Sequence, residues 1–187
     1  MKIGIDISQL VYENTGVANY LQNLMQKLLE VDKKNEYVLF FASLRKEFPI
    51  SNFKFLNKSQ IPALPAGRSN FKIRKFKIPL ILLDFLWNKL HILPIEWFIG
   101  NVDIFITSDW TEPPVVKAKK ATILYDLIIY RNPGETDSKI IQTQKRKLNW
   151  VKKESDMIFC ISQATKKDAM EILGIDSKRL KVIYPGM

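Results

Sequence analysis

Apolar runs typical of buried β-strands alternate with segments of helical periodicity along most of the 187 residues. Parallel strands need a crossover of a dozen or more residues, usually a helix, so this alternation indicates a parallel sheet with helices on both faces. We predict an α/β protein with a doubly wound sheet of six or more strands. The predicted strands are residues 2–7, 36–42, 101–107, 121–125, 156–161 and 180–184, with a weaker candidate at 52–56.

Three helices carry clear signals. Apolar residues after Gly16 recur at the three-and-four spacing of one helical face, and Asn14 and Thr15 are residue types that cap a helix start. Two further helices are predicted over 135–153 and 162–173. The second of these begins at a serine that can cap it and stops at a glycine, which favours these boundaries.

The start of the first helix is also a candidate anion site. Unpaired amides and the positive end of the helix dipole point back toward the carboxyl edge of the first strand. Gly16 has no side chain, so a phosphate group could approach the backbone closely. Gly16 by itself is equally compatible with a residue that only turns the chain, whereas strand, loop and helix together favour the anion site.

The charge balance favours anionic partners. The chain has 29 Lys and Arg against 19 Asp and Glu, a net charge of +10, which suits nucleotide phosphates, anionic lipid headgroups or nucleic acid. No nucleic-acid-binding module is recognisable, so we expect no nucleic-acid partner. The single Cys160 lies in an apolar run, which predicts a buried structural thiol in a reducing compartment. The first residues do not form a secretory signal, and we expect a cytoplasmic location.

Several common chemistries lack their residues. The single histidine, His91, lies in an apolar stretch, where we interpret it as structural, and this disfavours Ser/His/Asp and Cys/His catalysis. No dense group of metal ligands and no P-loop, dinucleotide or nucleophile-elbow motif occurs. We therefore expect no metal site and no cofactor.

Residues 68–99 combine a basic stretch with an apolar one. Polar residues interrupt the apolar run before it reaches the ~20 residues of a spanning helix, so we predict no transmembrane segment here. Two interpretations stay open: a helix lying on an anionic membrane surface, or a core-packed helix that follows a basic loop. The cations are Arg68, Lys72, Arg74, Lys75 and Lys77, and the apolar run spans 78–87.

Four motifs occur in a fixed order. They are residues 1–6 (MKIGID) with 15–20 (TGVANY), 103–108 (DIFITS), 122–127 (TILYDL) with 133–135 (PGE), and 161–168 (ISQATKKD) with 173–175 (LGI) and 182–186 (VIYPG). Together they resemble the amino-terminal half of a GT-B fold glycosyltransferase of family 4 (glycosyl transferases group 1). The resemblance spans nearly the whole chain and implies a Rossmann-like sheet.

The resemblance also implies a function. Residues 1–187 would form the acceptor-side domain, with 68–99 as a basic and apolar insertion, and a carboxyl-terminal donor domain would be absent from this chain. The implied enzyme is retaining and metal-independent. It moves a hexose, such as mannose, from a nucleoside-diphosphate sugar to a cell-envelope saccharide or lipid-linked acceptor at the inner face of the plasma membrane. The alternative is a non-catalytic membrane- or anion-binding module with a Rossmann-like core.

Donor and catalytic residues follow from the same resemblance. Gly16 and Val17 would line the donor diphosphate, where the helix dipole stabilises the departing phosphate. The family's histidine corresponds to Tyr125, which can donate a hydrogen bond but does not titrate near neutrality. The neighbouring Asp126 is retained and would hold sugar or acceptor hydroxyls. The alternative for Asp126 is a carboxylate that caps its own loop.

Acceptor-binding candidates follow two strand ends, where open α/β sheets bind ligands. Asp109, Trp110 and Glu112 come after the strand at 101–107. The Trp110 ring could stack on a sugar or pack on a neighbouring proline. Arg131 and Glu135 lie beyond Tyr125 and could line the acceptor cleft, or serve as a solvated loop residue and a helix-start charge.

Overall fold

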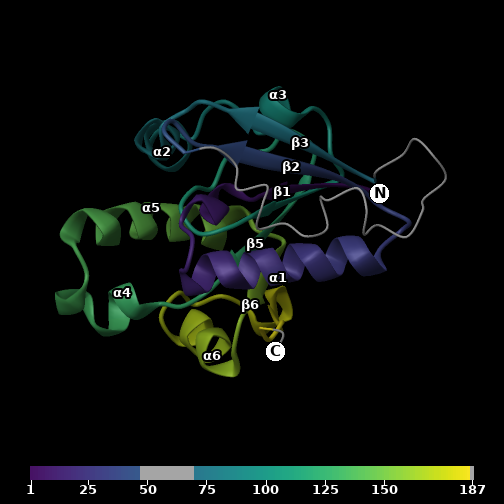
Figure 1. The fold of residues 1–187 in the computed structure, drawn as a ribbon. Helices are drawn as coiled ribbons and strands as arrows, with labels where there is room; N and C mark the ends of the chain where they lie inside the picture. The colour runs from purple at the N-terminus through teal and green to yellow at the C-terminus, as the bar shows by residue number, and fades with distance from the viewer. Residues whose placement is uncertain (47–69, 186–187) are drawn as a thin grey trace.

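One parallel sheet organises the protein. The structure, a computed structural model, describes residues 1–46 and 70–185. Seven strands in these ranges follow the order β3-β2-β1-β4-β5-β6-β7, all parallel (Figure 1). This order reverses between β1 and β4, which confirms the predicted doubly wound α/β fold. The strands are β1 Lys2–Asp6, β2 Glu36–Ala42, β3 Phe71–Phe76, β4 Ile104–Thr107, β5 Lys119–Leu124, β6 Met157–Cys160 and β7 Leu180–Val182.

Capping side chains set the starts of the three longest helices. Thr15 Oγ1 accepts a hydrogen bond from the Ala18 N–H at 3.2 Å, and Ser162 caps α6 in the same way. Asp137 caps α5, which therefore begins a few residues later than predicted. The helices are α1 Gly16–Val31, α2 Leu80–Leu83, α3 Glu96–Ile99, α4 Ile128–Arg131, α5 Ser138–Glu154 and α6 Gln163–Glu171, with a π-helix, η4, at Asp84–Lys89 and 3-10 turns η1 at Ser8–Val11, η5 at Pro133–Glu135 and η6 at Ser177–Arg179.

The sheet is covered on both faces. On one face α1 packs its buried side, including Leu21 and Met25, against alternate residues of β1 and β2. The opposite face carries α2, η4 and α3, whose Leu83 and Trp87 pack against the other side of β2. Helices α5 and α6 pack against β5 to β7 in a further apolar cluster. Cys160 is fully buried there, which confirms its prediction as a buried thiol.

The edge strand β3 lies in the basic stretch, where no strand is predicted from the sequence. Its apolar residues Phe71, Ile73 and Phe76 are partly buried, while the cations between them are exposed. Phe71 and Ile73 lie on the face that packs toward α1, whereas Phe76 packs on the opposite face near α2 and α3. The exposed cations between them also discourage pairing of this edge strand with another chain. The candidate strand at 52–56 and Arg68 lie outside the described residues.

Within residues 1–46 and 70–185, no helix combines the length and the apolar character needed to cross a bilayer.

Two glycines provide a test of the packing. A methyl group on Gly4, in β1, would stand 2.7 Å from the Phe105 ring and 2.8 Å from Ile99. We expect Gly4→Ala to lower the free energy of unfolding by about 1–3 kcal/mol, the usual cost of overpacking. At Gly16 the same methyl group would meet nothing within 4 Å, so Gly16→Ala is the control. Urea denaturation of both variants measures the difference, and equal stabilities would contradict this packing.

Candidate functional site

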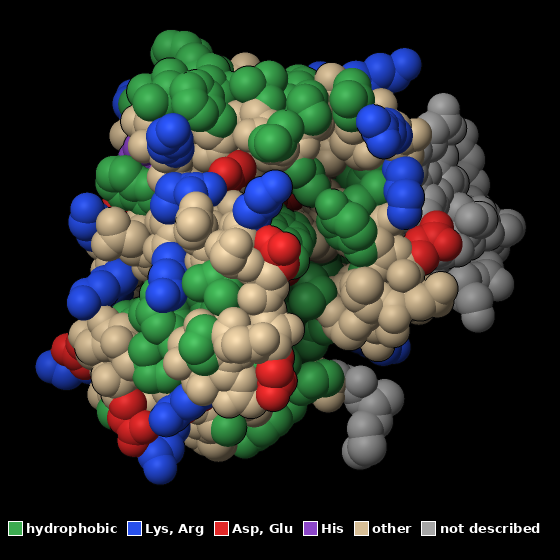
Figure 2. Space-filling view, turned by 90° about the vertical axis from the view of Figure 1, so that its left-hand side faces the viewer, with side chains coloured by type: hydrophobic (Ala, Val, Ile, Leu, Met, Phe, Trp, Pro, Cys, Tyr) green, Lys and Arg blue, Asp and Glu red, His purple; other side chains and the backbone are tan. Residues whose placement is uncertain are grey.

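The carboxyl edge of the sheet is the candidate site. Open α/β sheets bind ligands where the strand order reverses, which here is between β1 and β4. The strands in Figure 1 point toward the face that Figure 2 shows, and this face has a depression near its middle with acidic side chains at the rim. Residues that follow β1, β4 and β5 therefore meet in one region.

The tip of α1 opens at this same edge (Figure 1). Gly16 is exposed and Val17 is half-buried, and the space beside the Gly16 backbone is open. The first amides of a helix have no acceptor within it, and the positive end of the dipole lies among them. The tip therefore has both the room and the polarity to receive an anion.

A buried lysine is the centre of a polar cluster beside this tip. Lys147 of α5 is 2% exposed, and its Nζ donates a hydrogen bond to the Ser108 carbonyl at the end of β4. The Ser108 hydroxyl lies 3.1 Å from the Tyr125 hydroxyl, which joins the ends of β4 and β5. Asp6, also 2% exposed, ends β1 and accepts a hydrogen bond from the Ser8 N–H at 2.9 Å.

Burial perturbs the charges in this cluster. It raises the pKa of the Asp6 and Asp109 carboxyls, and the positive charge of Lys147 opposes the rise in both. Burial lowers the pKa of Lys147 itself, against the pull of the surrounding carboxylates, and it raises the pKa of Tyr125. Perturbed groups gathered at strand ends are a mark of functional sites.

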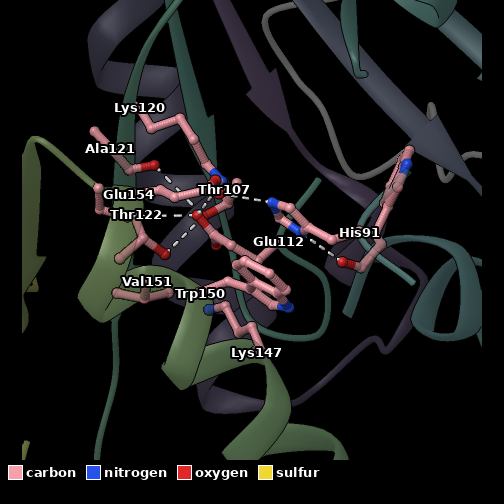
Figure 3. Close-up of polar contacts among 12 residues, drawn as sticks. His91, Thr107, Glu112, Lys120, Ala121, Thr122, Lys147, Trp150, Val151 and Glu154 are labelled. Atoms are coloured by element: carbon pink, nitrogen blue, oxygen red, sulfur yellow. Dashed lines mark hydrogen bonds and ion pairs between the residues drawn. The ribbon is translucent and has the colours of Figure 1, made fainter. Parts of the chain in front are cut away.

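A second buried network fixes the segment that follows β4 (Figure 3). Glu112 is fully buried, accepts a hydrogen bond from Thr107 at 2.6 Å and pairs with Lys120 at 3.2 Å. Lys120 also pairs with Glu154 at 2.8 Å, and Glu154 holds His91 Nε2 at 2.8 Å. These contacts connect β4 and β5 to α5 and to the end of η4.

The structure places Glu112 in the interior and not in the acceptor crevice. It was predicted to line the acceptor crevice, but its carboxylate is enclosed and engaged by Thr107 and Lys120. No acceptor sugar can reach a fully buried group of this kind, so Glu112 acts as an internal counter-ion. The sequence could not reveal this, because Lys120 reaches it from a different strand.

His91 has a structural place, as interpreted from the sequence. Its Nδ1 lies 2.8 Å from the Trp87 carbonyl, and its ring stacks on Trp150 with centroids 3.6 Å apart. With Glu154 at Nε2, both ring nitrogens are engaged. The half-buried side chain joins the end of η4 to α5.

Of the other predicted site residues, one group lies near the Lys147 cluster and the other lies apart from it. Asp109 belongs to the first group; it is half-buried and accepts a hydrogen bond from Gln144. Tyr125 is buried, and its ring packs edge-on against the Tyr20 ring. Asp126 is exposed and its Oδ1 accepts from the Ile128 N–H at 3.0 Å, the loop-capping contact considered from the sequence. Trp110 is half-buried next to Asp109.

Arg131 and Glu135 lie apart from this cluster. Arg131 forms ion pairs with Asp168 at 2.5 Å and Glu171 at 3.2 Å, both on α6. Glu135 is exposed in η5 and accepts a hydrogen bond from Asn132. Arg131 therefore ties α4 to α6, and the contacts of neither residue bring it to the Lys147 cluster.

Sequence reasoning missed Asp6 and Lys147. A carboxylate that ends an apolar strand was a usable signal for Asp6, because strand ends carry ligand-binding groups. Lys147 had no such signal, since it is one of several cations in α5. In the described parts of the chain, no group of three or more His, Cys, Asp or Glu side chains is placed to hold a metal ion.

The fold resembles that of a solved nucleotide complex. The structure is similar to HepE of Anabaena, crystallised in complex with UDP, with a TM-score of 0.50 and 12% identity. The match covers 100% of this chain and 44% of HepE, so the chain spans less than half the length of that protein. No family model and no curated protein matches the sequence. At this identity the comparison shows the fold, a Rossmann-like α/β domain.

The buried lysine can be tested by stability. Lys147→Met removes a buried cation that interacts with the carboxylates of Glu112, Asp109 and Asp6, and leaving a buried charge without its partner is strongly destabilising. We expect the free energy of unfolding at neutral pH to fall by about 3 kcal/mol. Lys145→Met, at an exposed position of the same helix, is the control and should change it little. Similar losses in both variants would contradict the cluster.

Asp6 predicts a pH dependence. Its pKa is raised in the folded state above the ordinary 3.8, so ionisation costs stability as pH rises from below 3.8 through the folded-state pKa. An asparagine side chain cannot ionise, so the Asp6→Asn variant should gain stability relative to the wild type as pH rises through this window. Denaturation of both proteins across the acid range measures the difference. A constant difference would rule out a raised pKa.

Proposed function

We propose that this chain is the acceptor-side lobe of a glycosyltransferase that uses a nucleoside-diphosphate sugar. The observation that carries the proposal is the placement of the open α1 tip and the Lys147 cluster on the same sheet edge. The likeness of fold to a protein solved with UDP supports a nucleotide-sugar donor. The four family-like motifs support a retaining, metal-independent transferase with a GT-B arrangement.

In the proposed reaction the bond between the sugar's anomeric carbon and the diphosphate breaks. The diphosphate leaves with the bonding electron pair, and the amides around Gly16 and Val17 with the dipole of α1 stabilise its growing charge. The acceptor's hydroxyl oxygen forms the new bond and its proton is released. No metal is required, because the helix tip supplies the positive field.

The acceptor would lie against the rim formed by Asp109, Trp110 and Asp126. Asp109 and the free oxygen of Asp126 can accept hydrogen bonds from sugar hydroxyls, and the Trp110 ring can stack on a sugar. Tyr125 and Lys147 hold this rim in place through Ser108. We propose a hexose, such as mannose, transferred to a cell-envelope saccharide or lipid-linked acceptor. A carboxyl-terminal lobe would close over the donor.

A non-catalytic membrane- or anion-binding module is the second candidate. It is favoured by exposed apolar side chains on α2 and η4, where Ile81 is 79% exposed. A module of this kind would bind its surface partner without hydrolysing or transferring any nucleotide sugar. Assay of the natural full-length protein against a panel of nucleotide sugars distinguishes the two candidates.

The donor and acceptor roles predict separate kinetic effects. In the full-length protein, Gly16→Leu should raise the KM for the nucleotide sugar about tenfold, because the leucine side chain obstructs the helix tip. Asp126→Ala should lower kcat about tenfold or more, which corresponds to the free energy of one hydrogen bond to a charged group. Release of nucleoside diphosphate measures both. Gly134→Leu is the matched control, because a methyl group there also meets nothing within 4 Å. Unchanged kinetics in both site variants would remove these assignments.

A further inference from the structure

The segment from α2 through η4 leaves one apolar side uncovered. Leu83 and Trp87 are fully buried against the sheet, whereas Ile81 is 79%, Leu82 44% and Phe85 43% exposed. The core-packed and surface-lying interpretations of this segment thus each describe one side of it. A globular domain seldom exposes neighbouring large apolar side chains without a partner for them.

These side chains form one stripe. Ile81 and Phe85 are four residues apart on the helix, the spacing of neighbours on one face. The π-helical turn brings Leu90, which is 47% exposed, below Phe85, because the Leu90 N–H donates to the Phe85 carbonyl at 2.9 Å. Figure 2 shows apolar side chains gathered at the top of this face, over α2 and η4.

Cations border the stripe, and its single carboxylate is neutralised. Lys77 is exposed at one end, and Lys89 Nζ lies 5.5 Å from the Phe85 ring centroid. Between residues 70 and 92 the only acid is Asp84, which Arg146 of α5 holds at 2.6 Å. The same ion pair fixes α5 beside η4. The stripe therefore presents positive charge without free negative charge.

A cationic hollow adjoins this surface along α5. A space of about 440 Å³ between α4, α5 and α6 has Lys145, Arg146 and Lys152 in its lining, which contains no carboxylate. Lys145 and Lys152 form no ion pair with any described residue, and Arg146 Nε is buried without a hydrogen-bond partner among the described residues. Leu148 and Leu173 supply apolar walls. Phosphate with adjoining hydrocarbon suits such a lining.

We propose that α2, η4 and the outer side of α5 form a docking surface for an anionic lipid bilayer. The apolar stripe enters the interface, the lysines around it meet the anionic headgroups, and the hollow receives a lipid phosphate. A nucleic acid would use the cations but not the stripe, and an apolar protein partner would use the stripe but not the hollow. The bilayer accounts for both, and this inference holds whether or not the chain belongs to a transferase.

Vesicle co-sedimentation of the full-length protein tests this. We expect binding to phosphatidylcholine vesicles that contain phosphatidylglycerol, and little binding to phosphatidylcholine alone. Ile81→Ser with Phe85→Ser, and separately Lys145→Glu with Lys152→Glu, should each lower the binding constant about tenfold or more. The controls are Val31→Ser with Val116→Ser, at exposed apolar positions elsewhere, and Lys119→Glu with Lys178→Glu, near the amino edge of the sheet.

Four outcomes would overturn the proposal. The first is binding that does not depend on phosphatidylglycerol, and the second is equal loss in the test and control variants. The third is calorimetric binding of inorganic phosphate at the hollow without vesicle binding, which would assign the hollow to a soluble phosphate ester. If the apolar variant instead lowers Tm without vesicles and leaves sedimentation unchanged, another part of the protein covers the stripe, and the proposal also fails.

Discussion

The need to neutralise charges buried between the sheet and α5 determines how this region is built. Glu112 has no exposure to water, so its ionised form requires a cation within the protein, and Lys120 lies 3.2 Å away. Lys120 is itself buried and takes a second carboxylate, Glu154, from the end of α5. Strand, loop and helix are thus held by one chain of charges, and a shift in any of them would leave a charge unpaired.

The two sides of helix α5 contact different parts of the molecule. Its inner side contributes Lys147 to the cluster that faces the strand ends and Glu154 to the pair that holds Lys120. Its outer side presents Lys145 and Lys152 toward the hollow next to α6. An acceptor at the sheet edge and a bilayer against α5 would therefore be neighbours. A lipid-linked acceptor would suit such an arrangement, because its headgroup would enter the edge from the adjoining surface.

Much of the fold could be predicted from local signals. The period of the apolar residues after Gly16 and the capping role of Thr15 are properties of neighbouring residues, and both are found in α1. The strand β3 was missed because its inward residues alternate with cations, which is the composition of a solvated edge. Asp109 was found near the cluster for a general reason: residues that follow parallel strands meet at one edge.

By itself the sequence determined the alternation of strands and helices, and with it the class of fold, since periodicity and capping act over a few residues. Only the tertiary structure decided which polar residues are enclosed by other charges and which stay at the rim of the sheet edge. Glu112 and Asp109 both follow β4, yet one is enclosed by Lys120 and the other stays at the rim. That difference depends on Lys120 and Lys147, which the sheet register and the packing of α5 bring in from distant positions. Charge pairing in a buried site acts through space, and the sequence does not record it.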